Sequence, residues 1–171
     1  AAYQKALEFA NERVQGRTAD GSRTIIGHAD VRRMLMRMKT LTEAARAICL
    51  DTAVSLDMAK AVPGADGKAW FARGAFLTPI AKAFGTDTGM EVAELGVQVH
   101  GGMGFIEETG AAQFYRDVRV TAIYEGTNGV QAADLVGRKL ADGGAAANAL
   151  LAEIRAVAES AHGEFEALAG Q

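Results

Sequence analysis

The sequence has little cysteine and proline and no long apolar run. Its one cysteine, Cys49, excludes an internal disulfide, and its Cys and His residues show no metal-ligand spacing. No apolar stretch approaches the ~20 residues of a membrane span. Positive charge is not in excess, because 18 basic and 21 acidic residues leave a net charge of −3. The composition therefore gives no electrostatic argument for a nucleic-acid partner.

Alanine is the residue that the chain has in abundance. It occupies 35 of 171 positions while proline occupies 2, and these are the best and the worst helix formers. With 49% apolar and 23% charged residues, the chain has the composition of one folded domain. We therefore expect an all-α protein. Because a helical pattern starts at Ala1 with no initiator methionine, we expect a piece cut from a longer chain.

Apolar residues recur at steps of three and four, the helical period, along most of the chain. The pattern predicts helices over residues 1–16, 30–60, 68–99, 110–117 and 128–143. One more amphipathic helix is expected in the last thirty residues, with Phe165 and Leu168 on its apolar face. Helices joined by mostly short connections predict an antiparallel helical bundle.

Turn-forming residues set the expected ends of these helices. His28 is placed as a cap or turn residue, and Pro63-Gly64 and Asp66-Gly67 are expected to end the second helix. Pro79 either kinks the third helix or starts a new one. The apolar stretch 118–124 is expected to be extended or irregular.

A glycine cluster follows the third helix at Gly101, Gly102 and Gly104. A dinucleotide-binding fingerprint needs a strand before the glycines and a helix directly after them. Here a helix precedes them, so that interpretation fails. The spacing alone indicates a helix end and an exposed tight turn over residues 101–110, where glycine easily adopts a positive φ.

The sequence Tyr124-Glu125-Gly126-Thr127-Asn128 places an acid directly before an expected helix. Thr127 can cap that helix, and Glu125 is then only an acid near its N-terminus. Alternatively, Glu125 is a carboxylate held in an apolar wall as a general base. The pattern alone favours the capped helix start.

Five short blocks follow one another in a fixed order along residues 1–140. They are Glu12-Arg13-Val14-Gln15-Gly16-Arg17, His28-Ala29-Asp30-Val31, Gln98-Val99-His100-Gly101-Gly102-Met103-Gly104-Phe105, Tyr115-Arg116-Asp117 and Ile123-Tyr124-Glu125-Gly126-Thr127. This ordered set resembles the C-terminal helical domain of the acyl-CoA dehydrogenase family. It is most similar to the longer subfamily, which includes 3-methylthiopropionyl-CoA dehydrogenases.

The resemblance implies FAD-dependent α,β-dehydrogenation of an acyl-CoA thioester, a flavoprotein reaction of fatty acid metabolism. Glu125 would be the base that removes the α-proton, and hydride would pass to FAD. Tyr124 and Gly126, on either side of the base, would contact the substrate. The residues implied to bind FAD are Arg13, Gln98, Val99, His100, Gly101, Gly102 and Thr127. Glu125 is also expected beside the Gln98–Gly102 block.

Two positions depart from the family pattern. Gly129 stands where the family often has glutamine, and Gly16 stands where many members have phenylalanine. Among the remaining candidates, Cys49 lies on a helical stripe and is expected to be a buried apolar thiol. Met34, Met36 and Met38 are interpreted as helix packing and surface.

The resemblance divides the chain into a family domain, residues 1–140, and a helical extension, residues 141–171. The family's N-terminal helical domain and middle β-domain are missing from this sequence, so we expect the fragment alone to be inactive. The implied partners are acyl-CoA, an electron-transfer flavoprotein or a similar acceptor, and further copies of the chain in a homo-oligomer. We expect a bacterial-type cytoplasmic location, with the mitochondrial matrix as the alternative. The rival function is a helical scaffold or oligomerisation module without catalytic activity.

Overall fold

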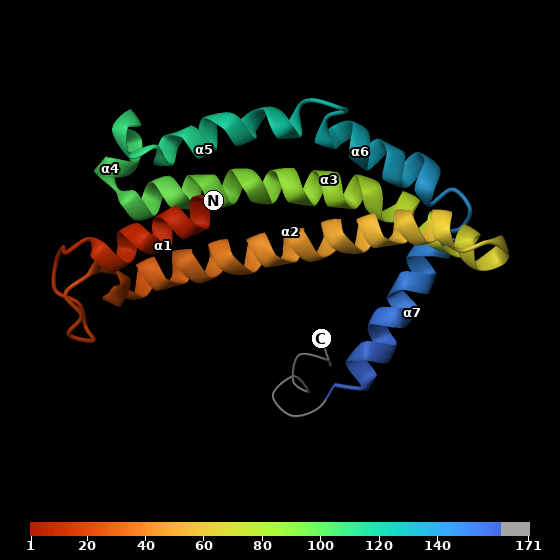
Figure 1. Cartoon of the computed structure of the whole chain (residues 1–171), viewed down its shortest axis with the longest axis horizontal. Helices are drawn as coiled ribbons and strands as arrows, with labels where there is room; N and C mark the ends of the chain where they lie inside the picture. The colour runs from red at the N-terminus through yellow and green to blue at the C-terminus, as the bar shows by residue number, and fades with distance from the viewer. Residues whose placement is uncertain (162–171) are drawn as a thin grey trace. The chain divides into compact units, whose positions relative to one another are not determined.

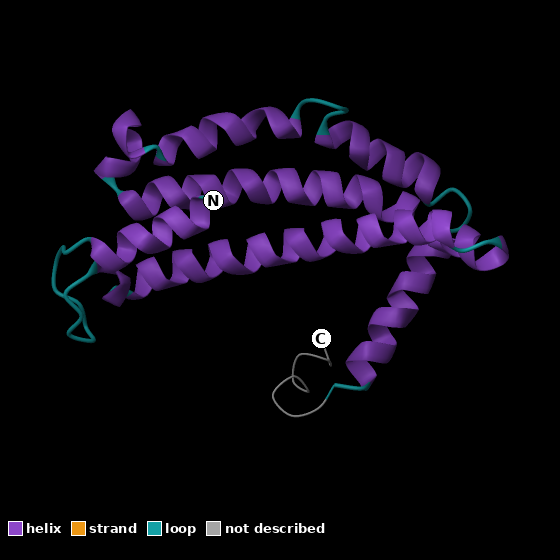
Figure 2. Ribbon diagram, viewed as in Figure 1, coloured by secondary structure: helices purple, strands orange, loops and turns teal. Residues whose placement is uncertain are grey.

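The computed structural model describes residues 1–161, and all regular structure in that range is helical (Figures 1 and 2). The α-helices are α1 (Ala2–Glu12), α2 (Ala29–Ala61), α3 (Gly64–His100), α4 (Gly102–Phe105), α5 (Ala111–Val118), α6 (Asn128–Asp134) and α7 (Ala145–Glu159). Short 3-10 helices lie at Ile25–Gly27, Glu107–Thr109 and Arg119–Ala122, and a π-helical turn lies at Leu135–Lys139. The expected all-α fold is confirmed. None of the described helices combines the length and the apolar character that crossing a membrane would require.

The chain divides into two compact units. The first contains residues 1–49 and 81–129, and the second contains residues 50–80 and those from 130 onward. The long helices α2 and α3 run through both units, so each unit includes one part of each helix.

The first unit is built around α1, the first part of α2 and the last part of α3. Its core contains fully buried Ala6 and Ala10 from α1 and fully buried Met38 from α2. Val92 and Val99 of α3 complete the same cluster. Because the two alanines are small, α1 can approach the longer helices closely. This packing fixes the C-terminal end of α3, from which the glycine-rich segment continues.

The second unit contains the α2–α3 connection and α7. Arg73 of α3 donates to Asp51 of α2 at 2.8 Å and to Glu153 of α7 at 2.5 Å. Beside this network, Ser55 is fully buried and Leu77 is 5% exposed. These charged contacts connect α7 to α2 and α3, which precede it by more than forty residues.

The structure corrects the expected ends of the second and third helices. Asp66 and Gly67 do not end the second helix, because α3 already begins at Gly64. A Cβ at Gly67 would lie 2.0 Å from the Val62 carbonyl oxygen, so the absent side chain allows this tight start. Pro79 lies inside a continuous α3, so no new helix starts there.

Two further expectations change. Residues 101–110 are not a plain exposed turn, since they contain α4 and a 3-10 helix and Gly104 is buried. Cys49 is exposed, so the expectation of a buried thiol is wrong. Helical spacing identifies a repeating face, but only the neighbours decide whether that face is covered. The last predicted helix exists as α7, while Phe165 and Leu168 lie outside the described residues.

Candidate functional site

The first part of the candidate site is the glycine turn at the end of α3. Gly101 has φ +58° and ψ −138°, a conformation that side chains disfavour, and its N–H donates to the Gln98 carbonyl at 3.0 Å. A Cβ at Gly104 would lie 2.3 Å from the Val97 carbonyl oxygen. In contrast, Cβ atoms at Gly101 and Gly102 would meet nothing within 4 Å. The turn is therefore packed at Gly104 and open at its first two glycines.

The residues before these glycines face in different directions. Val99 and His100 are buried, with 4% and 5% of their surfaces exposed, whereas Gln98 is exposed. The His100 ring stacks on Phe9 with centroids 4.4 Å apart, and its Nδ1 lies 2.7 Å from the Gly96 carbonyl oxygen. The side chains of Val99 and His100 thus belong to the core, and only their backbone can meet an external group.

Arg13 follows the end of α1 in the same unit. Its backbone is held because the Ile25 N–H donates to the Arg13 carbonyl at 2.8 Å. Its exposed guanidinium donates to the Gln15 amide oxygen in long hydrogen bonds of 3.4 Å. Because that partner is neutral, the positive charge of Arg13 remains available to an anion.

A hollow of about 370 Å³ lies between α1 and the segment that follows α3. Glu8 and Glu12 of α1 line it together with His100 and Glu108. Lys5 also lines the hollow, but three carboxylates outnumber this one lysine, so the charge of the lining does not favour an anion there.

The second part of the candidate site is the loop between α5 and α6. The backbone N–H groups of Ile123 and Tyr124 donate to the Val120 carbonyl at 2.9 and 3.1 Å. Glu125 then has φ +52°, which makes it the one residue other than glycine with a positive φ in the described range, and Gly126 has φ +85°. Side chains rarely adopt this conformation outside functional or tightly constrained positions.

The surroundings of Glu125 differ from the expected apolar wall. Glu125 is exposed, and Ile123 and Tyr124 each expose 51% of their surface. Within the described residues, the two apolar residues that directly precede Glu125 in the chain are therefore about half exposed. Thr127 directly precedes α6, at the capping position that the sequence predicts.

The two parts of the site are not adjacent. The helix α5 and the 3-10 helix Arg119–Ala122 separate them, and at about 1.5 and 2.0 Å per residue these elements span about 20 Å. Figure 1 shows α4 at one end of α5 and the loop to α6 at the other. The expectation that Glu125 lies beside the Gln98–Gly102 block is therefore wrong.

Sequence reasoning missed a polar cluster at the start of α6. The Asn128 side-chain amide contacts three residues of α3, namely Lys82, Thr86 and Asp87, at 2.7–3.0 Å. These partners lie more than forty positions earlier in the chain, so no local pattern could have identified them. An asparagine at a helix start is ordinarily interpreted as a cap.

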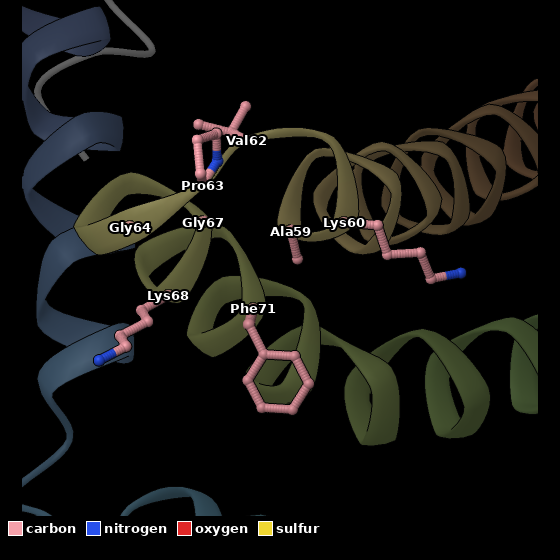
Figure 3. Close-up of a pocket in the computed structure, with 8 residues that line it drawn as sticks. All are labelled: Ala59, Lys60, Val62, Pro63, Gly64, Gly67, Lys68 and Phe71. Carbon is pink, nitrogen blue, oxygen red and sulfur yellow. The ribbon is translucent and has the colours of Figure 1, made fainter.

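A separate hollow of about 420 Å³ lies at the α2–α3 turn of the second unit (Figure 3). Lys60 and Lys68 extend away from each other there, and Phe71 lies on the first turns of α3. The lining contains no acid or histidine and none of the predicted site residues, so it offers no proton acceptor. Among the described residues, no group of three or more His, Cys, Asp or Glu side chains is arranged to hold a metal ion.

Comparisons with known proteins converge on one family. A family model described as the acyl-CoA dehydrogenase C-terminal domain matches residues 1–141. The chain is 54% identical to 3-methylmercaptopropionyl-CoA dehydrogenase of Ruegeria pomeroyi, over 84% of this chain and 25% of that protein. It is 37% identical to a butyryl-CoA dehydrogenase of Syntrophomonas wolfei, over 81% of this chain and 24% of that protein.

The fold comparison agrees. The solved structure of butyryl-CoA dehydrogenase from Megasphaera elsdenii matches with a TM-score of 0.66 and 31% identity, over 81% of this chain and 32% of that chain. The present chain spans about a quarter of the length of the two curated relatives.

Proposed function

The chain belongs to the acyl-CoA dehydrogenase family, and from this premise we propose that it is the C-terminal part of an FAD-dependent enzyme that dehydrogenates acyl-CoA thioesters. Residues 1–140 would form the family domain and residues 141–171 an added helical segment. The observation that carries the proposal is Glu125, held with φ +52° before α6 and beside uncovered apolar residues. A positive φ is uncommon outside glycine, and residues with such backbone cluster at active sites and ligand-binding segments.

The glycine turn fits the phosphate end of FAD. Gly101 and Gly102 are exposed, and no atom would crowd even an added Cβ, so backbone groups can approach a phosphate closely. Gln98 would add an exposed side-chain amide, and Arg13 a positive charge that has no acidic partner among the described residues. Val99 and His100 would contribute through their backbone, since their side chains are buried. Thr127, next to the base, would contact the other end of the cofactor.

The base would act on the carbon next to the thioester carbonyl. The Glu125 carboxylate would take the α-hydrogen as a proton, and the electron pair left behind would form the Cα–Cβ double bond as the β-hydrogen leaves. Bound FAD would supply the acceptor for that hydride. Tyr124 and Gly126 would line the acyl group on either side of the carboxylate. A neighbouring domain covering Ile123 and Tyr124 would exclude water from the proton transfer.

The remaining domains would be needed for activity. Within the described residues Glu125 is exposed, so the chain alone leaves the base in water, and we infer that the isolated chain does not catalyse the reaction. An electron-transfer flavoprotein or a similar protein would reoxidise the flavin. Exposed apolar residues of α2, such as Leu50 and Val54, support assembly with further copies of the chain. A bacterial-type cytoplasmic location remains our expectation.

The substrate proposed for the first assay is a 3-methylthiopropionyl-CoA thioester. The support is the 54% identity to a dehydrogenase of that name, against 37% to a butyryl-CoA dehydrogenase. Comparing kcat/KM for the methylthio and butyryl thioesters tests the choice, and a higher value for butyryl-CoA would overturn it.

The test of the proposed base is Glu125→Gln in a polypeptide that includes the amino-terminal domains. Glutamine keeps the shape but cannot accept the proton. Flavin content and acyl-CoA binding should survive, while flavin bleaching in anaerobic stopped flow should slow by about 100-fold or more. Exposed Glu94 of α3 provides the matched control, since Glu94→Gln should bleach at the normal rate. Normal bleaching by Glu125→Gln would refute the assignment, and a colourless protein would favour the helical scaffold instead.

A further inference from the structure

The Asn128 side chain is held by groups that fix its orientation. Its Nδ2 donates to Asp87 Oδ1 at 2.7 Å and to Thr86 Oγ1 at 3.0 Å, and its Oδ1 accepts from Lys82 Nζ at 2.8 Å. A lysine ammonium can only donate and an ionised carboxylate can only accept. The amide therefore has one arrangement that satisfies both, with oxygen toward Lys82 and nitrogen toward Asp87.

This arrangement requires an amide at position 128. Alanine would lose the side-chain hydrogen bonds to α3, and aspartate would place a second carboxylate against Asp87. The cluster joins the first residue of α6 to the middle of α3, and α3 belongs to the packed core of the same unit through Val92 and Val99. Asn128 thus anchors the start of α6 to a rigid element.

The anchor lies only three residues after Glu125. On the other side of the loop, the Val120 carbonyl accepts the backbone N–H groups of Ile123 and Tyr124. The strained segment Glu125-Gly126, with φ +52° and +85°, is therefore held between two fixed points. If the Asn128 anchor is released, the backbone of Glu125 and Gly126 can relax toward ordinary φ values, and the Glu125 carboxylate would move with it.

We propose that Asn128 is a positioning residue for the base: its amide, held between Lys82 and Asp87, keeps the Glu125 loop in the conformation from which the carboxylate reaches the α-proton. The inference rests on the proposed function of Glu125. It concerns orientation alone, so Asn128 touches neither substrate nor cofactor in this account.

The first test uses Asn128→Ala in the complete flavoprotein. A displacement of about 1 Å in a reacting group can cost about 100-fold in rate, so we expect flavin reduction by acyl-CoA to slow by about 10- to 100-fold. Flavin content and the dissociation constant for acyl-CoA should stay close to the wild-type values. The matched control is Asn148→Ala on α7, where an exposed asparagine makes one 3.3 Å bond to the Gly143 carbonyl. An unchanged reduction rate in Asn128→Ala would overturn the proposal.

The second test separates positioning from general loosening of the fold. In a Glu125→Gln background there is no base to position, so adding Asn128→Ala should change the residual rate less than twofold. If the fold-loss in flavin-reduction rate of the double variant equals the product of the two single-variant losses, Asn128 acts independently of Glu125. That result would overturn the proposal. If Glu125→Gln itself reduces at the normal rate, the proposed function fails first, and the two failures are therefore distinguishable.

The third test restores the hydrogen bonds with exchanged residues. Asn128→Asp alone should slow reduction because two carboxylates face each other. In the double variant with Asp87→Asn, the carboxylate at position 128 accepts from Lys82 and the new amide at position 87 donates to that carboxylate. The rate of flavin reduction should then recover to within about threefold of wild type. A double variant that keeps its flavin and its melting temperature but stays as slow as Asn128→Asp would contradict the proposed arrangement.

Discussion

Alanine substitutions along the glycine turn should affect stability in an order that the structure dictates. Gly104→Ala is the severe change, because its Cβ would lie 2.3 Å from the Val97 carbonyl oxygen and 2.9 Å from His100 Cβ. A backbone oxygen at the end of a packed helix cannot yield easily, so the turn must shift. Overpacking of this kind costs about 1–3 kcal/mol, and we expect the upper end, about 3 kcal/mol.

The two neighbouring glycines provide matched controls within the same turn. Gly101→Ala meets no atom but retains φ +58° and ψ −138°, which should cost about 1–3 kcal/mol in strain. Gly102→Ala meets no atom either and has no positive φ, so it should stabilise the chain by about 0.4–1 kcal/mol through the unfolded state. The expected stability order is Gly102→Ala, wild type, Gly101→Ala, Gly104→Ala.

Thermal unfolding of the 171-residue chain, followed by far-UV circular dichroism, measures this order. For a chain of this length, about 3 kcal/mol corresponds to a melting temperature about 6–12 °C lower. A Gly104→Ala variant that melts with the wild type would refute the described packing of Gly104 against α3. A Gly102→Ala variant destabilised by more than about 1 kcal/mol would refute the open surface at that glycine.

Three other expectations concern single groups. Arg73→Ala should lower the free energy of unfolding in urea by about 1–3 kcal/mol, because it leaves the Asp51 carboxylate without its guanidinium partner. Adding Asp51→Ala should lower it little further, and losses that add up would show that the pair is not coupled. The hydrogen bond from the Ser22 backbone N–H contributes most to lowering the pKa of Asp20. The stabilisation from this carboxylate is therefore present above its ordinary pKa and is lost as pH falls through the lowered value. The melting temperature of Asp20→Asn should therefore lie below that of wild type at neutral pH and converge with it in acid, and a constant gap would contradict this linkage. Exposed Cys49 should react fully with a thiol reagent before any denaturant is added, and protection until unfolding would mean that the thiol is buried after all.

The sequence by itself determined the all-α fold class, the bounds of two helices and the family. Apolar residues at helical spacing predicted α2 to within one residue at each end, because a thirty-residue amphipathic stripe leaves few alternatives. The same pattern located α5 to within one residue. Blocks such as Gln98–Phe105, in a fixed order, pointed to the acyl-CoA dehydrogenase family, which the comparisons then confirmed. These properties are local, or depend only on order along the chain.

Only the tertiary structure decided which faces are covered and how the site is held. Helical spacing placed Cys49 on an apolar stripe, yet the described residues leave it exposed. The inward direction of His100 depends on Phe9, about ninety residues earlier, and the orientation of the Asn128 amide depends on Lys82 and Asp87. The left-handed backbone of Glu125, at φ +52°, is likewise a feature that helical spacing did not indicate. The positions of His100 and the Asn128 amide arise from contacts between residues far apart in sequence, and hydrophobic periodicity carries no information about such contacts.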